Sequence, residues 1–140
     1  MDFMASLKIC SSGLAAQRAK MDVITSNLAN AETTQTPEGG PYKKKTVVLS
    51  AEPLSGNFDA ALKDAVRTVK VEKIVEDKAV RMVYDPTHPD ADGKGFVAKP
   101  NISSVMEMAD MITTSRNYEA CVTAFDATKN MALKAMEIGR

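Results

Sequence analysis

The segment DPTHPDADGKG, residues 85–95, holds the side chains with the clearest potential for chemistry. It places His88 beside an Asp-x-Asp-Gly run that begins at Asp90, and so resembles part of a calcium-binding loop. An EF-hand loop takes ligands from twelve residues and ends in a bidentate Glu, which is missing here. We therefore predict a turn held by its prolines and capped by its Asp side chains, with Gly93 and Gly95 at positive φ and no bound metal.

Other groups that could carry out catalysis lack the partners they would need. One His and two isolated cysteines, Cys10 and Cys121, cannot supply a Cys/His zinc site, and no Gly-rich loop has phosphate-binding spacing. No Ser or Cys has a His base placed by local sequence, and Glu72 and Glu76 fit a solvated surface better than a catalytic pair. We expect no enzyme, no cofactor and no metal. The cysteines are predicted to be small buried apolar side chains, with a disulfide as the alternative.

Charge and hydropathy exclude two broad classes of partner. Lys plus Arg and Asp plus Glu both number 18, so the net charge is zero and nothing favours nucleic acid or an anionic membrane surface. No apolar run approaches the roughly 18 residues of a membrane span, and the first residues make a poor cleavable signal peptide.

The run Lys43–Lys45 is predicted to be a solvated strand edge that resists unwanted pairing.

Two long helices are predicted, one at each end of the chain. Apolar residues at coiled-coil spacing predict a helix over Phe3–Asn30, about 40 Å long. A second period, uninterrupted by Pro or Gly, predicts a helix over Ile102–Ile138, about 55 Å long, with Ser103 or Ser104 as N-cap and Gly139 beyond its end. The two expected apolar faces comprise Phe3, Leu7, Cys10, Leu14, Met21, Ile24 and Leu28, and Met108, Met111, Tyr118, Val122, Phe125, Leu133 and Met136.

The middle of the chain is predicted to be a small, mostly β insert. β-Branched residues predict strands over residues 44–50, 68–75 and 78–84, the last two joined as a hairpin through Glu76 and Asp77. Residues 57–66 predict a short helix.

These elements define a mainly α architecture, in which the long terminal helices pair as a coiled coil, with the small, mostly β insert between them in the chain. We expect an N-terminal helix over residues 1–32, an insert over 33–101 and a C-terminal helix over 102–140. So small an insert cannot bury both apolar stripes, and isolated helices gain most of their stability from packing. We therefore predict a subunit of a polymer, whose terminal helices become ordered on assembly.

The end of the first helix, in the stretch ITSNLANAETTQTPEGGPY, is rich in small and amide side chains. Ser26, Asn27 and Asn30 can bond exposed carbonyls or a neighbouring helix, and Ala29 and Ala31 allow another backbone to approach closely. The segment is therefore expected to be an interface and not a reaction centre.

Three motifs in this order resemble the flagellar rod and hook axial proteins, in particular those of the proximal rod of the bacterial basal body. They are SNLANAETTQTPEGGPY, DPTHPDADGKGFVAKPNI and MITTSRNYEACVTAFDATKNMALKAMEIGR. The resemblance implies a structural subunit of the periplasm-spanning rod, the drive shaft that transmits torque for motility. It also implies export by the flagellar type III export apparatus without a cleaved signal peptide. One departure is Glu32, where many axial proteins have Asn.

The same resemblance implies partners and an interface. The partners are further copies of the chain, other flagellar rod proteins and the ring-to-rod adaptor. The expected interface residues are Leu7, Leu14, Met21, Asn27, Leu28, Asn30, Thr33, Thr34, Arg116, Asn117, Tyr118, Val122, Phe125 and Met136. We expect that Asn27→Asp or Val122→Asp blocks assembly and leaves the insert folded.

Two other interpretations fit parts of the pattern. A small helical adaptor or secreted binding protein that folds on one partner shares the amphipathic ends, but predicts a one-to-one complex. A metal-dependent enzyme centred on His88 and Asp90 predicts a folded monomer with tight metal binding, against which the missing ligands argue.

Overall fold

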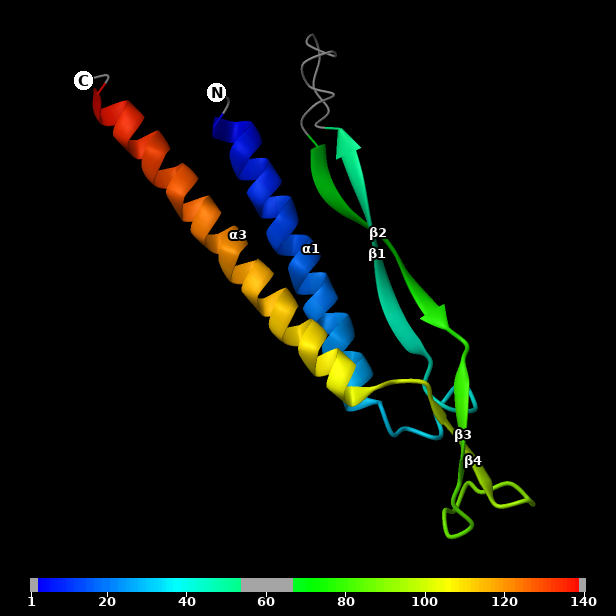
Figure 1. The fold of residues 1–140 in the computed structure, drawn as a ribbon. Coiled ribbons are helices and arrows are strands. Elements are labelled where there is room, and N and C mark those ends of the chain that lie inside the picture. Colours follow the sequence, from blue (N-terminus) through cyan, green and yellow to red (C-terminus); the bar gives the residue numbers. More distant parts are fainter. Residues whose placement is uncertain (1–2, 54–66, 139–140) are drawn as a thin grey trace.

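The chain forms an elongated layered structure in which two long helices lie side by side on one side of a small β insert (Figure 1). The computed structural model describes residues 3–53 and 67–138. The predicted helix over residues 57–66 and the stop at Gly139 lie outside these residues. The elements in chain order are α1 (Phe3–Ala29), β1 (Lys44–Pro53), β2 (Arg67–Asp77), β3 (Val80–Tyr84), β4 (Phe96–Pro100) and α3 (Ser104–Ile138).

Both long helices are confirmed to within two residues. Ser103 stands at the N-cap position of α3, since its carbonyl accepts the Glu107 N–H at 3.0 Å and the helix begins at the next residue. Neither helix in the described part of the chain is long and apolar enough to cross a membrane.

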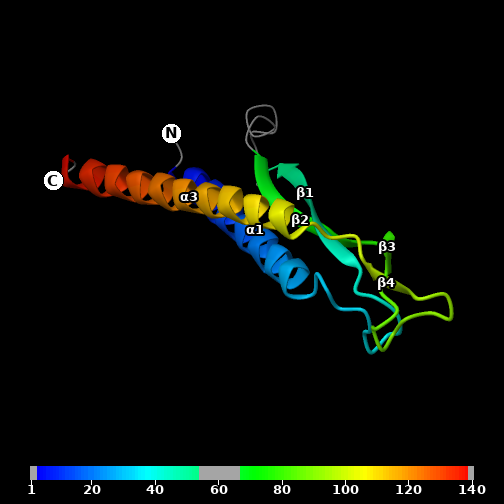
Figure 2. The same cartoon turned by 60° about the horizontal axis from the view of Figure 1, so that its bottom comes forward.

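The helices α1 and α3 run antiparallel and side by side, so that the start of α1 and the end of α3 lie at the same end of the helix pair (Figures 1 and 2). Near the other end of the pair, Asn27 Nδ2 lies 3.2 Å from Glu107 Oε2. Farther along, a Cβ on Gly13 would stand 3.5 Å from Cys121 Sγ. From Gly13 to Asn27 and from Glu107 to Cys121 each helix advances 14 residues, so the register stays constant between the two contacts.

The face of α3 that is least exposed differs in part from the predicted apolar face. Met111, Tyr118 and Phe125 are half-buried as expected, whereas Met108, Val122, Leu133 and Met136 are 36–65% exposed. The less exposed positions follow alternating steps of four and three residues: Glu107, Met111, Thr114, Tyr118, Cys121, Phe125, Thr128 and Ala132. Apolar periodicity misses the polar members of this row because a helical Thr can bury its hydroxyl by bonding the carbonyl four residues earlier. Thr114 Oγ1 donates to Asp110 O at 2.7 Å, and Thr128 Oγ1 to Ala124 O at 2.9 Å.

The described part of the insert consists of two separate two-stranded antiparallel sheets, β1–β2 and β3–β4. The predicted hairpin between β2 and β3 is therefore wrong. Ala79 N–H bonds Asp77 Oδ1 at 2.9 Å, and the chain continues from β2 into β3 without reversing its direction (Figure 1). The reversal comes at the loop 85–95, after which β4 pairs with β3, with Tyr84 opposite Phe96.

The fold is more evenly divided between helix and strand than the mainly α prediction allowed. The strands β1 and β2 have 10 and 11 residues and exceed their predicted spans, and the five-residue β4 escaped prediction. The signal for β4 is weak because the strand is short and ends in Pro100.

Helix α1 lies between α3 and the β1–β2 pair (Figure 1). Val69 N–H of β2 donates to Ser12 Oγ at 3.2 Å, which ties this pair to the helix.

Cys10 and Cys121 are free thiols, both half-buried, so the alternative of a disulfide is not realised. Where α1, β1 and α3 meet, Ala31, Tyr42 and Ile102 form a small buried cluster.

Candidate functional site at the helix junction

Asn27, in the last turns of α1, is the centre of the junction and is 1% exposed. Its Nδ2 donates to Lys45 O at 2.8 Å, and its Oδ1 accepts the Lys45 N–H at 2.9 Å. One carboxamide thus satisfies both backbone groups of a strand-edge residue, as a neighbouring strand would. The side chain joins α1 to β1 at a point where apolar packing could not satisfy the buried backbone.

Two further groups determine which way the Asn27 amide points. Glu107 Oε2 lies 3.2 Å from Nδ2, and an ionised carboxylate only accepts hydrogen bonds. On the other side the Tyr42 hydroxyl donates to Oδ1 at 3.3 Å and lies 3.0 Å from Ser26 Oγ. An Asn flipped by 180° would face Glu107 with an oxygen, so this network selects one orientation.

Glu107 is 2% exposed, and its carboxylate has a cationic partner. Lys44 Nζ lies 2.8 Å from Oε1 in an ion pair, and this buried oxygen accepts no hydrogen bond from the described residues. Lys45 lies 3.8 Å from Glu76 and over the Tyr42 ring at 5.8 Å from its centroid. The prediction of a solvated lysine edge is therefore wrong for Lys44, because a buried carboxylate needs a cation within reach.

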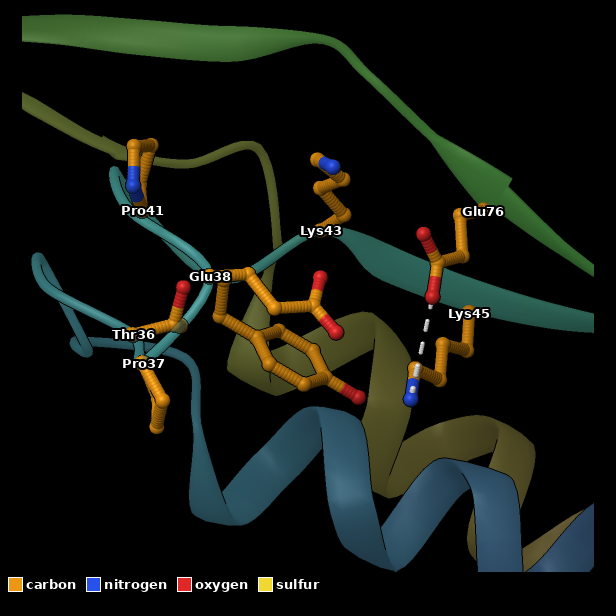
Figure 3. A pocket seen from close by; sticks show the side chains of 8 residues that line it. Thr36, Pro37, Glu38, Pro41, Lys43, Lys45 and Glu76 are labelled. Carbon is orange, nitrogen blue, oxygen red and sulfur yellow. Dashed lines mark ion pairs between the residues drawn. The ribbon is translucent and has the colours of Figure 1, made fainter.

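A small cavity of about 190 Å³ lies beside the junction (Figure 3). The loop over residues 36–41 forms one wall, and the paired Lys45 and Glu76 stand on the other. Its remaining polar lining is Thr36, Tyr42, Lys43 and Glu38. Cations and carboxylates alternate around it and no nucleophile with a base is present among these residues, so its chemistry indicates a surface hollow and not an active site.

The residues that follow Asn27 close the helix end and hold the next loop. Asn30 Nδ2 donates to Ser26 O at 2.9 Å, the same carbonyl that accepts the Asn30 N–H at 3.1 Å at the end of α1. Thr33 Oγ1 donates to Asn30 Oδ1 at 3.3 Å, and Thr34 Oγ1 to Asp90 Oδ2 at 2.8 Å. In this chain these side chains make intramolecular bonds that guide the backbone from α1 toward the β3–β4 sheet.

Glu32 adds an ion pair between the same segments. Lys99 Nζ lies 2.6 Å from Glu32 Oε2, and the hydrogen bond from Lys99 holds the pKa of this carboxyl below its ordinary value of 4.5. A depressed carboxyl pKa contributes stability that is present above the unfolded pKa and is lost as the pH falls through the folded one.

We expect Glu32→Gln to lose at most about 1 kcal/mol of stability at pH 7, because the Glu32 side chain is 72% exposed. At a pH below the folded pKa the variant and the original chain should be equally stable, since the carboxyl is then protonated. Urea unfolding at the two pH values measures the difference, with the exposed Glu72→Gln as control. A deficit of the same size at both pH values would contradict the role of the ion pair.

The loop over residues 85–95 is a turn stabilised by its own side chains. Asp85 Oδ1 accepts from Thr87 Oγ1 at 2.7 Å, a bond that lowers the pKa of the Asp85 carboxyl. His88 Nδ1 accepts the Asp90 N–H at 3.1 Å. Gly95 has a φ of 79°, as predicted, whereas the expected positive φ at Gly93 is not found. Within residues 3–53 and 67–138 no three His, Cys, Asp or Glu side chains are grouped to hold a metal ion.

The structure separates the residues predicted for an interface into three groups. Asn27, Asn30, Thr33 and Thr34 take part in the junction described above. Half-buried positions are Leu7, Leu14, Met21, Leu28, Tyr118 and Phe125, and exposed positions are Arg116, Asn117, Val122 and Met136. Sequence reasoning missed Tyr42, Lys44 and Glu107 as members of the site. The available signal was Glu107, an acidic residue in the first turn of α3.

Comparison with known proteins covers both ends of this architecture. A family model described as "Flagella basal body rod protein" matches residues 7–35, and one described as "Flagellar basal body rod FlgEFG protein C-terminal" matches residues 94–138. The first range includes most of α1 with Asn27, and the second includes β4 and α3 with Glu107.

Curated relatives extend the similarity over nearly the full length. The chain is 45% identical to the flagellar basal-body rod protein FlgC of Bacillus subtilis, over 96% of this chain and 97% of that protein. It is 36% identical to FlgC of Borreliella burgdorferi, over 99% and 98% of the two chains. For FlgC of Salmonella typhimurium the identity is 38%, over 94% of each chain.

The paired terminal helices and these relatives define a flagellar basal-body rod protein, a structural subunit and not an enzyme. Within that class the chain belongs to the FlgC family. The resemblance to axial proteins of the rod, expected from three sequence motifs, is confirmed.

Proposed function

We propose that the chain assembles with copies of itself and other rod proteins through the side of α3 that α1 leaves uncovered. The observation that supports this is a second apolar row on α3, next to the row that packs on α1. Successive members are three or four residues apart, or one heptad more than that. Their side chains are 36–76% exposed, and they are Val105, Met108, Ile112, Val122, Leu133 and Met136. The row is interrupted by Ser115, Glu119, Asp126 and Lys129. Exposed apolar side chains gathered along one face of a helix are typical of an interaction site in a soluble protein.

An open groove of about 490 Å³ between the two helices fits the same function. It is lined by Arg18, Met21, Asp22, Thr25, Met111 and Tyr118. Two of these, Met21 and Tyr118, belong to the interface expected from sequence. A helix of a neighbouring subunit that lay along the exposed row would set side chains into this groove, as ridges of one helix pack into grooves of another.

The pairing of α1 and α3 is proposed to be a coiled coil. The steps of four and three along α3 support this, because they are the spacing of coiled-coil seams. Residues 1–32 and 102–140 would then form the axial part of the subunit and residues 33–101 an insert that faces outward. The terminal helices pair within the single chain, and assembly into the rod is expected to complete their ordering.

In this proposal the interface residues have different tasks. Val122, Met136, Arg116 and Asn117 contact neighbouring subunits, since they are exposed. The half-buried Leu7, Leu14, Met21, Leu28, Tyr118 and Phe125 pack the helix pair. Asn27, Asn30, Thr33 and Thr34 maintain the register of the segments within one subunit.

The rod of such subunits transmits torque through many long helices packed side by side. The subunit is proposed to assemble in the periplasm and to be exported by the flagellar type III export apparatus without a cleaved signal peptide. The ring-to-rod adaptor is proposed as a further partner. The supporting fact is membership of the FlgC family, whose relatives are named basal-body rod proteins.

Val122→Asp and Ile112→Asp test this proposal. Each places a charge in the exposed row, so assembly should fail and swimming should be lost in a strain that carries only the variant gene. The free energy of unfolding should change by no more than about 0.5 kcal/mol, as for other surface substitutions. Ala120→Asp, exposed and outside the row, is the control and should swim. Normal swimming with both row variants would refute the docking face.

A further inference from the structure

We infer that Glu107 couples the pairing of the terminal helices to the docking of the insert. The three elements of the junction come from distant parts of the chain, with Asn27 on α1, Lys45 on β1 and Glu107 on α3. Asn27 holds the edge of β1 through both backbone groups of Lys45. Glu107 is the group from α3 that bonds the same amide.

The coupling follows from the chemistry of the amide. Asn27 can dock Lys45 only when its oxygen faces the Lys45 N–H and its NH₂ faces the Lys45 carbonyl. Glu107 Oε2 attracts the NH₂ end and repels the oxygen end, so its arrival stabilises the docking orientation. Without α3 in place, the Tyr42 hydroxyl alone would favour that orientation.

Lys44 of the insert also contacts Glu107, so the coupling acts in both directions. Its ammonium lies 2.8 Å from Glu107 Oε1, so the two carboxylate oxygens contact successive elements, α1 through Asn27 and β1 through Lys44. Burial of Glu107 without both contacts would leave a carboxylate with unsatisfied oxygens. Helix pairing and insert docking therefore favour one another, and the insert takes its place when the C-terminal helix has arrived.

Residue-resolved amide hydrogen exchange on the full chain tests this, in concentrated sucrose so that the compact state is favoured. Lys45 N–H reports docking because its partner is Asn27. Thr46, opposite Val75 in the β1–β2 register, provides a reference within the insert, because alternate residues of a strand turn their amides to opposite edges. We expect Glu107→Ala to speed exchange of Lys45 about tenfold relative to Thr46, the effect of one lost hydrogen bond.

Glu107→Gln separates the two contacts. A Gln side chain keeps an oxygen for Asn27 but loses the charge that attracts Lys44, so Lys45 protection should stay closer to that of the original chain. Asp110→Ala, one turn along α3 and exposed, is the control and should change nothing. Equal loss of protection at Lys45, Thr46 and α1 amides in Glu107→Ala would overturn the inference, because Glu107 would then support only global stability. So would a freely exchanging Lys45 in the original chain while α3 is protected, or a Gln variant as weak as the Ala variant.

Discussion

Asn27→Asp is expected to lower the free energy of unfolding by about 3–5 kcal/mol, the largest effect of any single change considered for this chain. The carboxylate cannot donate to Lys45 O, so a buried carbonyl loses its partner. It also places a second negative charge about where Nδ2 now lies, 3.2 Å from the Glu107 carboxylate. Two carboxylates in one buried site repel each other, and one of them must take up a proton or leave. Urea unfolding followed by helix circular dichroism measures the loss.

The matched control is Asn117→Asp, the same chemical change at an exposed position of α3. It should stay within about 0.5 kcal/mol of the original chain. Equal effects of the two substitutions would show that the Asn27 network does not hold the fold. Sequence reasoning expected Asn27→Asp to block assembly with the insert folded. The intramolecular bonds of Asn27 lead instead to the prediction that the subunit itself is destabilised.

Lys44→Met should cost about 3–5 kcal/mol, since it leaves the buried Glu107 carboxylate without a cation. The Lys44 side chain is 32% exposed, so the lower end of that range is expected, and unfolding by urea provides the measurement. Lys43→Met, the same change one residue earlier and outside this ion pair, should cost far less.

The double variant Lys44→Met/Glu107→Gln gives the sharper result. Replacing both members of a buried ion pair removes the uncompensated charge, so part of the lost stability should return. Because the two residues are in contact, their effects should not add. A double variant that is less stable than the sum of the single losses would contradict the assigned pair.

The positions of the long helices could be read from apolar periodicity alone, since helix bounds depend on local spacing and on breakers such as Pro and Gly. The same periodicity misplaced part of the contact face of α3. Met108 and Met136 are apolar but exposed, while Glu107 and Thr114 are polar and buried. Apolar periodicity indicates which side chains avoid water. It does not predict which of two adjacent apolar rows on a helix packs against another helix of the same chain.

Strand pairing was less accessible from sequence. Residues 68–84 read as a hairpin because two β-rich runs lie close together, whereas β3 pairs with β4 across the loop 85–95. The pairing partner of β3 depends on whether the chain reverses its direction at Asp77 or at Asp85, and the local sequence permits a reversal at either Asp. The reversal at Asp85 is selected only by the arrangement of β1, β2 and α1 in space.

The sequence by itself determined that this protein has two long terminal helices, a small β insert, no recognisable catalytic constellation and a likeness to flagellar rod proteins. These properties follow from local spacing, composition and motifs. The tertiary structure decided what Asn27 does. Its partners Tyr42, Lys45 and Glu107 lie 15, 18 and 80 residues away along the chain. A hydrogen-bond network of this kind exists only when α1, β1 and α3 have been brought together, because its energy depends on distances and burial that no single segment contains.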